Sequence, residues 1–389
     1  MSAGQVLSRR EFGKGIAAAT GALILSPAAA RAAEVLQRQG GGAAFTGRPF
    51  AADDYDSYAK LAANENPYGP SESVLQAMTT ALKYANRYGY PDGNILEAIA
   101  QLHDVDPSQL LLGAGSGELL SVSTLAFLSG GRRVIGVDPT FQTVYQFATG
   151  IHAESVRLPL LPDASQDIPL MVRTTRQNWR DVGLVYLCNP NNPTGRIVSA
   201  RDVRALLDGI PEDVPVLIDE AYHHFVEDPS YATSIPYVKD GRPVIVTRTF
   251  SKIAGLAGMR LGYAVAPPAL IERMRPHTIG SINAMVKWGG VASLKDTESQ
   301  ARVRQLNNEL RTKTARAIEA MGYRVIPSET NFLMIHIKRP VLPVIAAFKS
   351  KGVLVGRPFP PMTDHLRVSI GTPGEMERFM LGFKELFAV

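Results

Sequence analysis

Short, mainly apolar runs recur along the first two thirds of the chain, separated by segments with helical spacing of apolar positions. These runs lie at residues 110–112, 134–137, 156–161, 182–188, 214–218 and 244–246. A strand without a polar face is buried on both sides, so the pattern indicates a parallel sheet between two layers of helices. We therefore predict an α/β fold with a mostly parallel sheet sandwiched by helices, followed by a smaller α+β domain.

Apolar residues three and four positions apart predict the helices. In the first of these, at residues 71–84, one face carries Val74, Leu75, Met78 and Leu82. Further helices are predicted at residues 94–103, 118–127, 271–294 and 296–321. The segment 271–294 is apolar enough to be buried along its length, whereas 296–321 is charged and suited to link two domains. Turn-forming residues predict exposed loops at 60–70 and 86–93.

Beyond residue 321 the elements are shorter and of mixed type. Strands are predicted at 323–326, 332–337, 353–355 and 366–370, and helices at 341–350 and 374–387. This pattern predicts a compact α+β domain at residues 291–389 that follows a large domain at residues 63–290.

Composition narrows the class of protein. The 389 residues are 45% hydrophobic and 20% charged, as in soluble globular proteins with more than one core. The net charge is +5, but the basic residues are scattered without an aromatic–basic stripe, so we predict no nucleic-acid partner. The single cysteine, Cys188, lies in an apolar run and is predicted to be a small buried residue. Neither C-x-x-C nor H-E-x-x-H occurs, and no metal site is predicted.

The N-terminus has the features of an export signal. Residues 8–14 read S-R-R-E-F-G-K, a mild apolar segment follows at 15–25, and A-R-A at 30–32 forms a cleavage site. The pattern resembles the twin-arginine (Tat) signal, which implies a signal peptide at 1–32, the Tat export machinery as a partner and a periplasmic location. A basic amphipathic helix and a cytoplasmic location are the alternatives. The apolar segment is too short to span a membrane.

The glycine-rich residues that follow the signal, 33–56, are predicted to form a flexible leader within an N-terminal arm at 33–62.

Candidate functional residues follow the predicted strands. At the carboxyl ends of these strands lie Gly115, Ser116, Phe141, Asn192, Asp219, Tyr222 and Lys252. Because loops at that edge of a parallel sheet hold the ligand, we expect these residues to converge on one site. The alternating glycines at 113–117 precede a helix and suit an anion such as phosphate, although a tight turn without a ligand has the same pattern.

The segment 244–263 carries the most specific chemistry. Lys252 follows a strand and could form a Schiff base with an aldehyde cofactor, and Arg260, eight residues later, could bind its phosphate with a two-pronged contact. A solvated loop lysine is the alternative.

Six motifs in order then identify a family. They are N-E-N-P-Y-G at 64–69, Y-P-D at 90–92, N-P-N-N-P-T-G at 189–195, D-E-A-Y at 219–222, T-F-S-K-I-A-G-L-A-G-M-R-L-G-Y at 249–263 and L-R-V-S-I-G-T at 366–372. From about Leu61 to its end the chain resembles the fold-type I pyridoxal-phosphate aminotransferases of class I/II, and within them the histidinol-phosphate aminotransferase-like group. The resemblance implies transfer of an amino group between an amino acid, or a similar amine, and a 2-oxo acid.

The resemblance also implies roles toward the cofactor ring. Lys252 would carry the cofactor as a Schiff base and move the substrate proton, and Asp219 would pair with the pyridinium nitrogen. Asn192 and Tyr222 would bind the 3-oxygen of the ring. Phe141 would stack on it, at a position where many family members have Tyr or Trp; core filler is the alternative for this residue.

For the phosphate, the resemblance implies the backbone at Gly115 and Ser116 and the side chains of Ser116, Thr249, Ser251 and Arg260. Gly117 stands where the family often has an acidic residue. Tyr90 matches a tyrosine that reaches the phosphate from the neighbouring subunit, which implies a homodimer with shared sites.

For the substrate, the resemblance implies that Arg367 binds an acidic group, with Asn64 and Tyr68 beside it. Arg357 lies near a second family arginine but is offset by one residue, and a surface arginine is its alternative. Another reaction on the same scaffold, such as decarboxylation, elimination or oxidation, and a non-catalytic binding domain are the competing functions.

Overall fold

The computed structural model describes residues 52–387. The predicted export signal at residues 1–32 lies outside the described residues, as does most of the predicted leader. The prediction of a flexible leader through residue 56 is wrong at its end, because helix α3 (Ala52–Ser57) begins within it. The division into domains at residues 62 and 290 stays a prediction.

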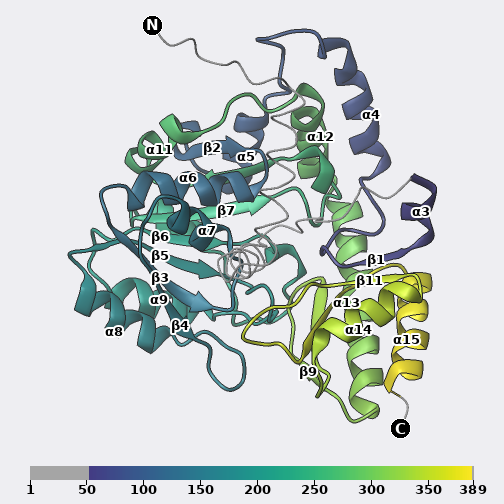
Figure 1. The fold of residues 1–389 in the computed structure, drawn as a ribbon. Helices are drawn as coiled ribbons and strands as arrows, with labels where there is room; N and C mark the ends of the chain where they lie inside the picture. Colours follow the sequence, from purple (N-terminus) through teal and green to yellow (C-terminus); the bar gives the residue numbers. More distant parts are fainter. Residues whose placement is uncertain (1–51, 388–389) are drawn as a thin grey trace, which may run out of the picture. The chain divides into compact units, whose positions relative to one another are not determined.

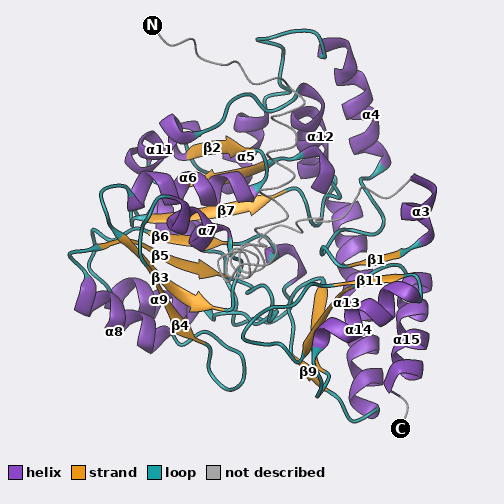
Figure 2. Ribbon diagram, in the orientation of Figure 1, coloured by secondary structure: helices purple, strands orange, loops and turns teal. Residues whose placement is uncertain are grey.

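A seven-stranded sheet forms the centre of the fold (Figures 1 and 2). In spatial order its strands are β2 (Leu110–Gly113), β8 (Gly262–Val265), β7 (Val244–Thr249), β6 (Val216–Asp219), β5 (Val182–Cys188), β3 (Arg133–Asp138) and β4 (Ser155–Pro159). Strand β8 is antiparallel to both of its neighbours, and the other pairs are parallel. The sheet confirms the predicted α/β class with a mostly parallel arrangement.

Consecutive strand residues face opposite helical layers. One layer consists of α6 (Ser116–Leu128), α7 (Thr143–Gly150) and α11 (Pro268–Met274). The other consists of α5 (Ile95–His103), α8 (Ile168–Asn178), α9 (Ala200–Gly209), α10 (Ile235–Lys239) and α12 (Ala284–Lys295). In β5, for example, Val185 and Leu187 pack on the α8–α9 side, while Leu184 and Tyr186 pack on the α6–α7 side.

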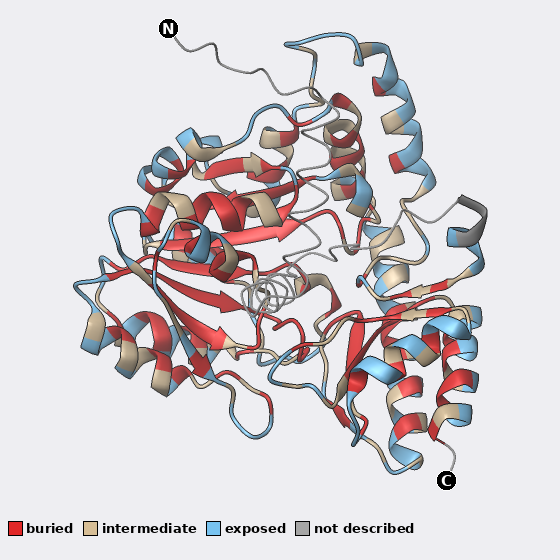
Figure 3. Cartoon of the chain, in the orientation of Figure 1, coloured by how far each residue is buried: buried red, intermediate tan, exposed pale blue. Residues whose placement is uncertain are grey.

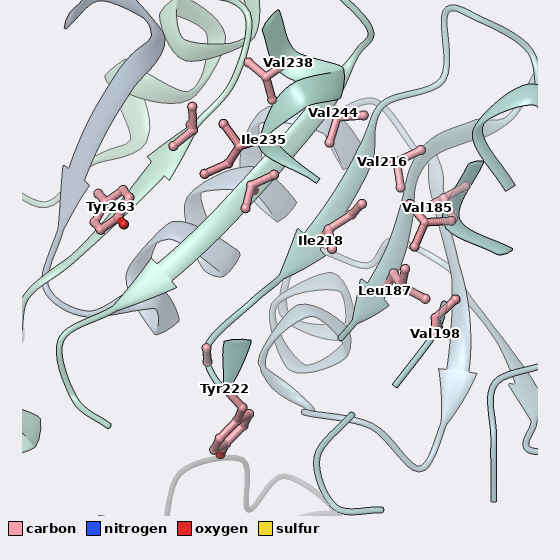
Figure 4. Packing of buried hydrophobic residues seen from close by; sticks show 14 of the residues in the cluster. Val185, Leu187, Val198, Val216, Ile218, Tyr222, Ile235, Val238, Val244 and Tyr263 are labelled. Carbon is pink, nitrogen blue, oxygen red and sulfur yellow. The ribbon is translucent and has the colours of Figure 1, made fainter. Parts of the chain in front are cut away.

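Burial on both faces explains why β5 has no charged residue and why β6 and β7 begin with uninterrupted apolar runs. Every residue of β5, β6 and β7 is buried, and the exposed residues lie on the outer surfaces of the helices (Figure 3). Figure 4 shows the valines and isoleucines of one face packed side by side, with Tyr222 beyond the end of β6. Cys188 is buried, as predicted. The site residues at the strand ends therefore stand on an extensively packed base.

Two helix predictions need correction. The single helix predicted at 271–294 is interrupted: α11 ends at Met274, a short 3-10 turn follows at Arg275–His277, and α12 begins only after residue 283. Helix α4 (Glu72–Ala81) forms as predicted, but Leu75 and Leu82 of its supposed apolar face are 43% and 52% exposed. Those two leucines do not contribute to the core of this chain.

The C-terminal part contains two smaller sheets and three helices. Strands β12 (His365–Ser369), β10 (Phe332–His336) and β9 (Arg324–Ile326) form an antiparallel sheet. Its neighbours are the helices α13 (Thr297–Ala320), α14 (Val341–Ser350) and α15 (Pro373–Phe387). Strand β1 (Ala59–Leu61), in a segment predicted to be a loop, pairs in parallel with β11 (Val353–Val355). No helix within residues 52–387 is both long enough and apolar enough to cross a membrane.

Candidate active site

The strand ends of the large sheet bring the central predicted residues together. Asp219 is the last residue of β6, Lys252 follows β7, and Asn192 lies in the loop after β5. Helix α6 begins at Ser116 directly after β2, two residues earlier than predicted. The antiparallel strand β8 does not disturb this convergence, because β2 runs parallel to β7 beyond it.

Arg260 lies among Gly115, Ser116, Thr249 and Ser251, a group of residues that we call the cradle. The Arg260 guanidinium donates to Ser251 Oγ at 3.3 Å and to the Ala114 carbonyl at 2.9 Å. Thr249 Oγ1 donates to Ser251 Oγ at 2.9 Å and accepts from the Ser251 amide at 3.0 Å.

Gly115 gives Arg260 its place in the cradle. The glycine has φ of 81° and precedes the first turn of α6. A Cβ atom at this position would lie 2.3 Å from Arg260 Nη2, so only glycine permits this packing. The helix N-terminus and the guanidinium thus point at the same small volume, which suits a phosphate.

Asp219 is a buried carboxyl group at the floor of the site. It is 2% exposed and accepts a hydrogen bond from Thr247 Oγ1 at 3.2 Å. Burial disfavours the charged form and raises the pKa of Asp219 to about 7, against the lowering effects of the Thr247 hydroxyl, a backbone amide and Lys252. A cationic group bound beside this carboxyl would therefore keep it ionised.

Lys252 is half-buried among groups that lower its proton affinity. Its Nζ donates to the Ala63 carbonyl at 3.1 Å and lies 5.7 Å from the centre of the Tyr222 ring. Burial lowers the pKa of Lys252 to about 8, and the cations of Arg367 and Arg260 add to this effect. The side chain is therefore a better base and nucleophile near neutral pH than an ordinary lysine.

Buried hydrogen bonds link Tyr222 to Asn64 in the N-terminal part of the described chain and to Arg367 and Ser369 in its C-terminal part. The Tyr222 hydroxyl accepts from Asn64 Nδ2 at 3.0 Å and from Asn192 Nδ2 at 3.3 Å. Asn192 Oδ1 accepts from Arg367 Nη1 at 2.6 Å, and Ser369 Oγ donates to Asn64 Oδ1 at 2.9 Å. The predicted substrate residues Asn64 and Arg367 thus share one network with the predicted cofactor residues.

Arg367 is held in place by the Phe359 ring and by two oxygen acceptors, Asn192 Oδ1 and the Ala62 carbonyl. Its Nη2 donates to the Ala62 carbonyl at 2.7 Å, and its guanidinium lies 4.6 Å from the Phe359 ring centre. Its buried Nε has no hydrogen-bond partner among the described residues. Arg357 packs on the same ring at 4.4 Å and donates to the Pro358 carbonyl, so it is a neighbour of Arg367 and not a remote surface arginine.

Three predicted residues lie at the margins of this network. The Phe141 carbonyl accepts from the Tyr186 hydroxyl, and its partly buried ring packs against the core beside α6 and α7. Tyr68 is 39% exposed and lies in the loop before α4. The Tyr90 hydroxyl donates to the Ile282 carbonyl within the same chain.

Sequence reasoning missed several supporting residues. Thr247, Phe359 and Ser369 all contact a predicted site residue, and the carbonyls of Ala62 and Ala63 hold Arg367 and Lys252. Ser369 lies two positions after Arg367 in a strand, which places both side chains on one face; this spacing was the available signal. In the described part of the chain, no group of three or more acidic, histidine or cysteine side chains is placed to hold a metal ion.

Comparison with known proteins agrees with this geometry. The family model "Aminotransferase class I and II" matches residues 56–381. The chain is 36% identical over 337 residues to a histidinol-phosphate aminotransferase of Moorella thermoacetica, covering 85% of each protein. It is also 36% identical to the corresponding enzyme of Symbiobacterium thermophilum, over 84% of this chain and 89% of that protein.

The chain therefore belongs to the class I and II aminotransferases, and it is a pyridoxal-phosphate-dependent transaminase. A solved structure of histidinol-phosphate aminotransferase from Sinorhizobium meliloti, in complex with pyridoxal 5′-phosphate, superimposes with a TM-score of 0.78. It covers 89% of this chain and 98% of that one at 24% identity, which establishes the shared fold.

The residues present fit this cofactor. The cradle around Arg260 suits the phosphate, the buried Asp219 carboxyl suits a protonated ring nitrogen, and Lys252 is an amine of lowered pKa between them. The Arg367 Nε, which has no partner among the described residues, would be free to donate to an anion.

Proposed function

We propose that the chain transfers an amino group from an anionic amine to a 2-oxo acid, with Lys252 as the proton carrier and Arg367 as the anchor of the substrate anion. The observation that carries this proposal is the shared network Arg367–Asn192–Tyr222–Asn64, which joins the anion-binding side to the lysine side. The curated relatives named as histidinol-phosphate aminotransferases support an amine of that type, which carries a phosphate, alongside amino acids with a carboxylate.

The residues of the chain divide the work among them. Pyridoxal phosphate, when bound, supplies an aldehyde that takes up the amino group and a ring that accepts the electron pair released at the substrate Cα. The cradle at Gly115, Ser116, Thr249, Ser251 and Arg260 would hold its phosphate.

At the opposite end of the ring, Asp219 would hold the proton of the ring nitrogen through a charge-assisted hydrogen bond. The neutral form of Lys252 would take the proton from the substrate Cα and hold it until it is returned during the transfer of the amino group. The Tyr222 hydroxyl, fixed by Asn64 and Asn192, would donate to the oxygen on the ring, with Phe141 stacked on the ring face. Arg367, which is buried and stacked on Phe359, would orient the substrate anion, with Arg357 and Tyr68 beside it.

A panel of amines distinguishes the substrate classes. Purified protein loaded with pyridoxal phosphate is mixed with single amino acids and with histidinol phosphate, and the absorbance of the bound cofactor is followed. We expect one class to bleach the cofactor band and a 2-oxo acid to restore it. If no amine changes the band, transamination by this site is refuted; if the band changes without recovery by any 2-oxo acid, another reaction on the cofactor is indicated.

We further propose a homodimer in which Tyr90 reaches the partner's cradle. Exposed apolar side chains support it: Leu75 on α4 and Leu82 directly after that helix are exposed, and Tyr88 and Ile279 are 99% and 88% exposed. Such a set suits a protein interface better than contact with water. Sedimentation of the purified protein tests this, and a monomer with full activity contradicts it.

Finally, we propose that the enzyme is exported in folded form and acts in the periplasm. The support is the S-R-R-E-F-G-K pattern at residues 8–14. Fractionation of cells that express the full chain should place the cleaved protein in the periplasm, and an Arg9→Lys, Arg10→Lys variant should stay inside. Equal distribution of both forms would overturn the proposal.

A further inference from the structure

A buried ion pair lies directly beneath the active site, outside the residues assigned above. Glu220 follows Asp219 in the chain, and Arg248 follows Thr247; the two side chains are 1% and 7% exposed. Glu220 Oε2 accepts from Arg248 Nε at 3.2 Å and from Arg248 Nη2 at 2.8 Å.

Glu220 has further hydrogen bonds that fix its position. Oε2 accepts from the Thr233 hydroxyl at 2.8 Å, and Oε1 accepts from the Ser234 amide at 2.6 Å. The Glu220 amide in turn donates to the Thr247 carbonyl at 2.9 Å. A buried carboxylate satisfied by this many donors has one orientation available to it.

The pair mirrors the Asp219–Thr247 contact on the other face of the sheet. Asp219 and Thr247 are partners in the register of β6 and β7, and Glu220 and Arg248 are the next residues along. Because side chains alternate between faces, Asp219 faces the α6 layer while Glu220 and Arg248 face the α5 layer. The ends of β6 and β7 are thus linked by one side-chain contact on each face of the sheet.

The contact network continues across a third strand. Arg248 pairs in register with Tyr263 on β8, and the Tyr263 hydroxyl lies 2.8 Å from His103 Nε2 on α5. Burial lowers the pKa of His103 to about 3, with the Arg248 cation as a second cause, so this imidazole stays neutral. A polar path of four side chains therefore ties β6, β7 and β8 to one helix.

We propose that the Glu220–Arg248 pair is a positioning element that holds the Asp219 carboxyl at its place opposite the cofactor's ring nitrogen and at a fixed separation from Lys252. The strand ends carry both side chains: Asp219 closes β6, and Lys252 lies four residues after Arg248. The inference rests on the proposed role of Asp219. A displacement of about 1 Å at a reacting group costs on the order of 100-fold in rate. Loss of the Glu220–Arg248 pair, which adjoins Asp219 in the chain, should therefore lower the turnover measurably.

The test compares Arg248→Met with Arg311→Met in the holoenzyme. Arg311 is equally buried, at 6% exposure, and forms ion pairs with Glu227 and Glu329 away from Asp219. The readout is nitrogen NMR of pyridoxal phosphate labelled at the ring nitrogen, together with turnover. We expect Arg248→Met to shift the ring-nitrogen signal toward the unprotonated form and to lower kcat about 10- to 100-fold. Arg311→Met should lower thermal stability without moving that signal.

A double variant separates position from stability. Replacing both members, as in Glu220→Met with Arg248→Met, removes the unpaired buried charge, so thermal stability should recover. The ring-nitrogen signal should remain shifted, because the link between the strand ends is still absent. If Arg248→Met is unstable, Arg248→Lys keeps the charge but loses the double contact, and a smaller shift in the same direction is expected.

The outcomes also distinguish this inference from the proposed function. Asp219→Asn in otherwise unchanged protein should shift the signal by itself; if it does not, the proposed role of Asp219 is wrong. If Asp219→Asn shifts the signal while Arg248→Met and the double variant leave it as in the parent, the Glu220–Arg248 pair only stabilises the fold and the inference is overturned.

Discussion

The two sides of the active site are assembled in different ways. On the proposed cofactor side, Asp219, Tyr222, Lys252 and Arg260 lie within one stretch of chain that includes the ends of the neighbouring parallel strands β6 and β7, and the remaining residues follow β2 and β5 of the same sheet. On the substrate side, Asn64 meets Ser369 across a separation of 305 residues, as Arg367 does with the Ala62 carbonyl. The first group is positioned by strand register, and the second by the packing of distant segments.

The residues on the two sides are therefore kept in position by different parts of the structure. Strands β5, β6 and β7 are buried along their whole length, so the positions of the residues at their ends are determined by the core. The substrate side instead depends on the two short strands β1 and β12 and on a few buried hydrogen bonds. We therefore expect variants on the cofactor side to change the chemistry, and variants on the substrate side to change substrate affinity while the cofactor stays as it was.

The largest effect should come from Lys252→Ala. Loss of the proton carrier should lower kcat by about 10³-fold, while the cradle and Asp219 still bind pyridoxal phosphate without a covalent link. Turnover and cofactor binding by dialysis measure the two parts. A variant with near-normal turnover would remove Lys252 from the reaction.

The substrate side is tested by Arg367→Lys. Lysine keeps the charge but cannot form the two-pronged contact or stack on Phe359 in the same way, so kcat/KM should fall about 30-fold. The spectrum of the bound cofactor should not change. An altered spectrum with unchanged KM would contradict the division into two sides.

Gly115→Ala tests the cradle against a matched control. The new methyl would lie 2.3 Å from Arg260 Nη2 at a φ of 81°, so the dissociation constant of pyridoxal phosphate should rise about tenfold. Gly117→Ala, two residues away, places its methyl where no described atom lies within 4 Å, and should bind the cofactor normally. Equal behaviour of the two variants would argue against a cradle at Gly115.

The pKa of Lys252 predicts a pH profile. The neutral amine is the reactive form, so its fraction grows as pH rises and levels off above the pKa, which burial lowers to about 8. The rate of covalent cofactor attachment to the cofactor-free protein should therefore increase about tenfold from pH 7 to pH 9 and then stay constant. A rate that still climbs steadily beyond pH 10 would indicate an ordinary, solvated lysine.

Ser369→Ala should give the smallest effect. The change removes the hydroxyl that donates to Asn64 Oδ1 and accepts from the Asn64 amide, which loosens one support of the Tyr222 network. We expect KM to rise about fivefold with little change in cofactor binding, as for the loss of about 1 kcal/mol of hydrogen bonding. Thermal denaturation monitors the accompanying loss of stability.

The two regions also differ in how far the sequence predicts them. The strand pattern predicts the large sheet because burial on both faces demands uninterrupted apolar runs, and strand ends then locate Asn192, Asp219 and Lys252. Strand β1 escapes prediction because three residues, Ala-Lys-Leu, are too few to establish their alternation as a strand pattern, and its pairing partner lies almost 300 residues away. The break before α12 had signals in Pro276, Gly280 and the N-cap Asn283, but the apolar positions on either side of it favoured one continuous helix.

Burial on the outer helices could not be predicted for a different reason. Leu75 and Leu82 have the spacing of a core-facing stripe, yet they face outward in this chain. An apolar stripe shows that a helix face is covered but does not show by what. Phe359, which stacks on Arg367, belongs to a contact that exists only after the fold has formed, whereas Ser369 could have been found from its spacing to Arg367.

The contact between Asn64 and Ser369 sets an order for events during synthesis. A ribosome makes the chain from the N-terminus, and all seven strands of the large sheet are complete once Val265 has emerged. Asn64, made early, must wait for Ser369, which follows it by 305 residues. The strands that carry the proposed coenzyme site can thus assemble on a nascent chain, whereas the proposed amine site closes only after Ser369 has been made.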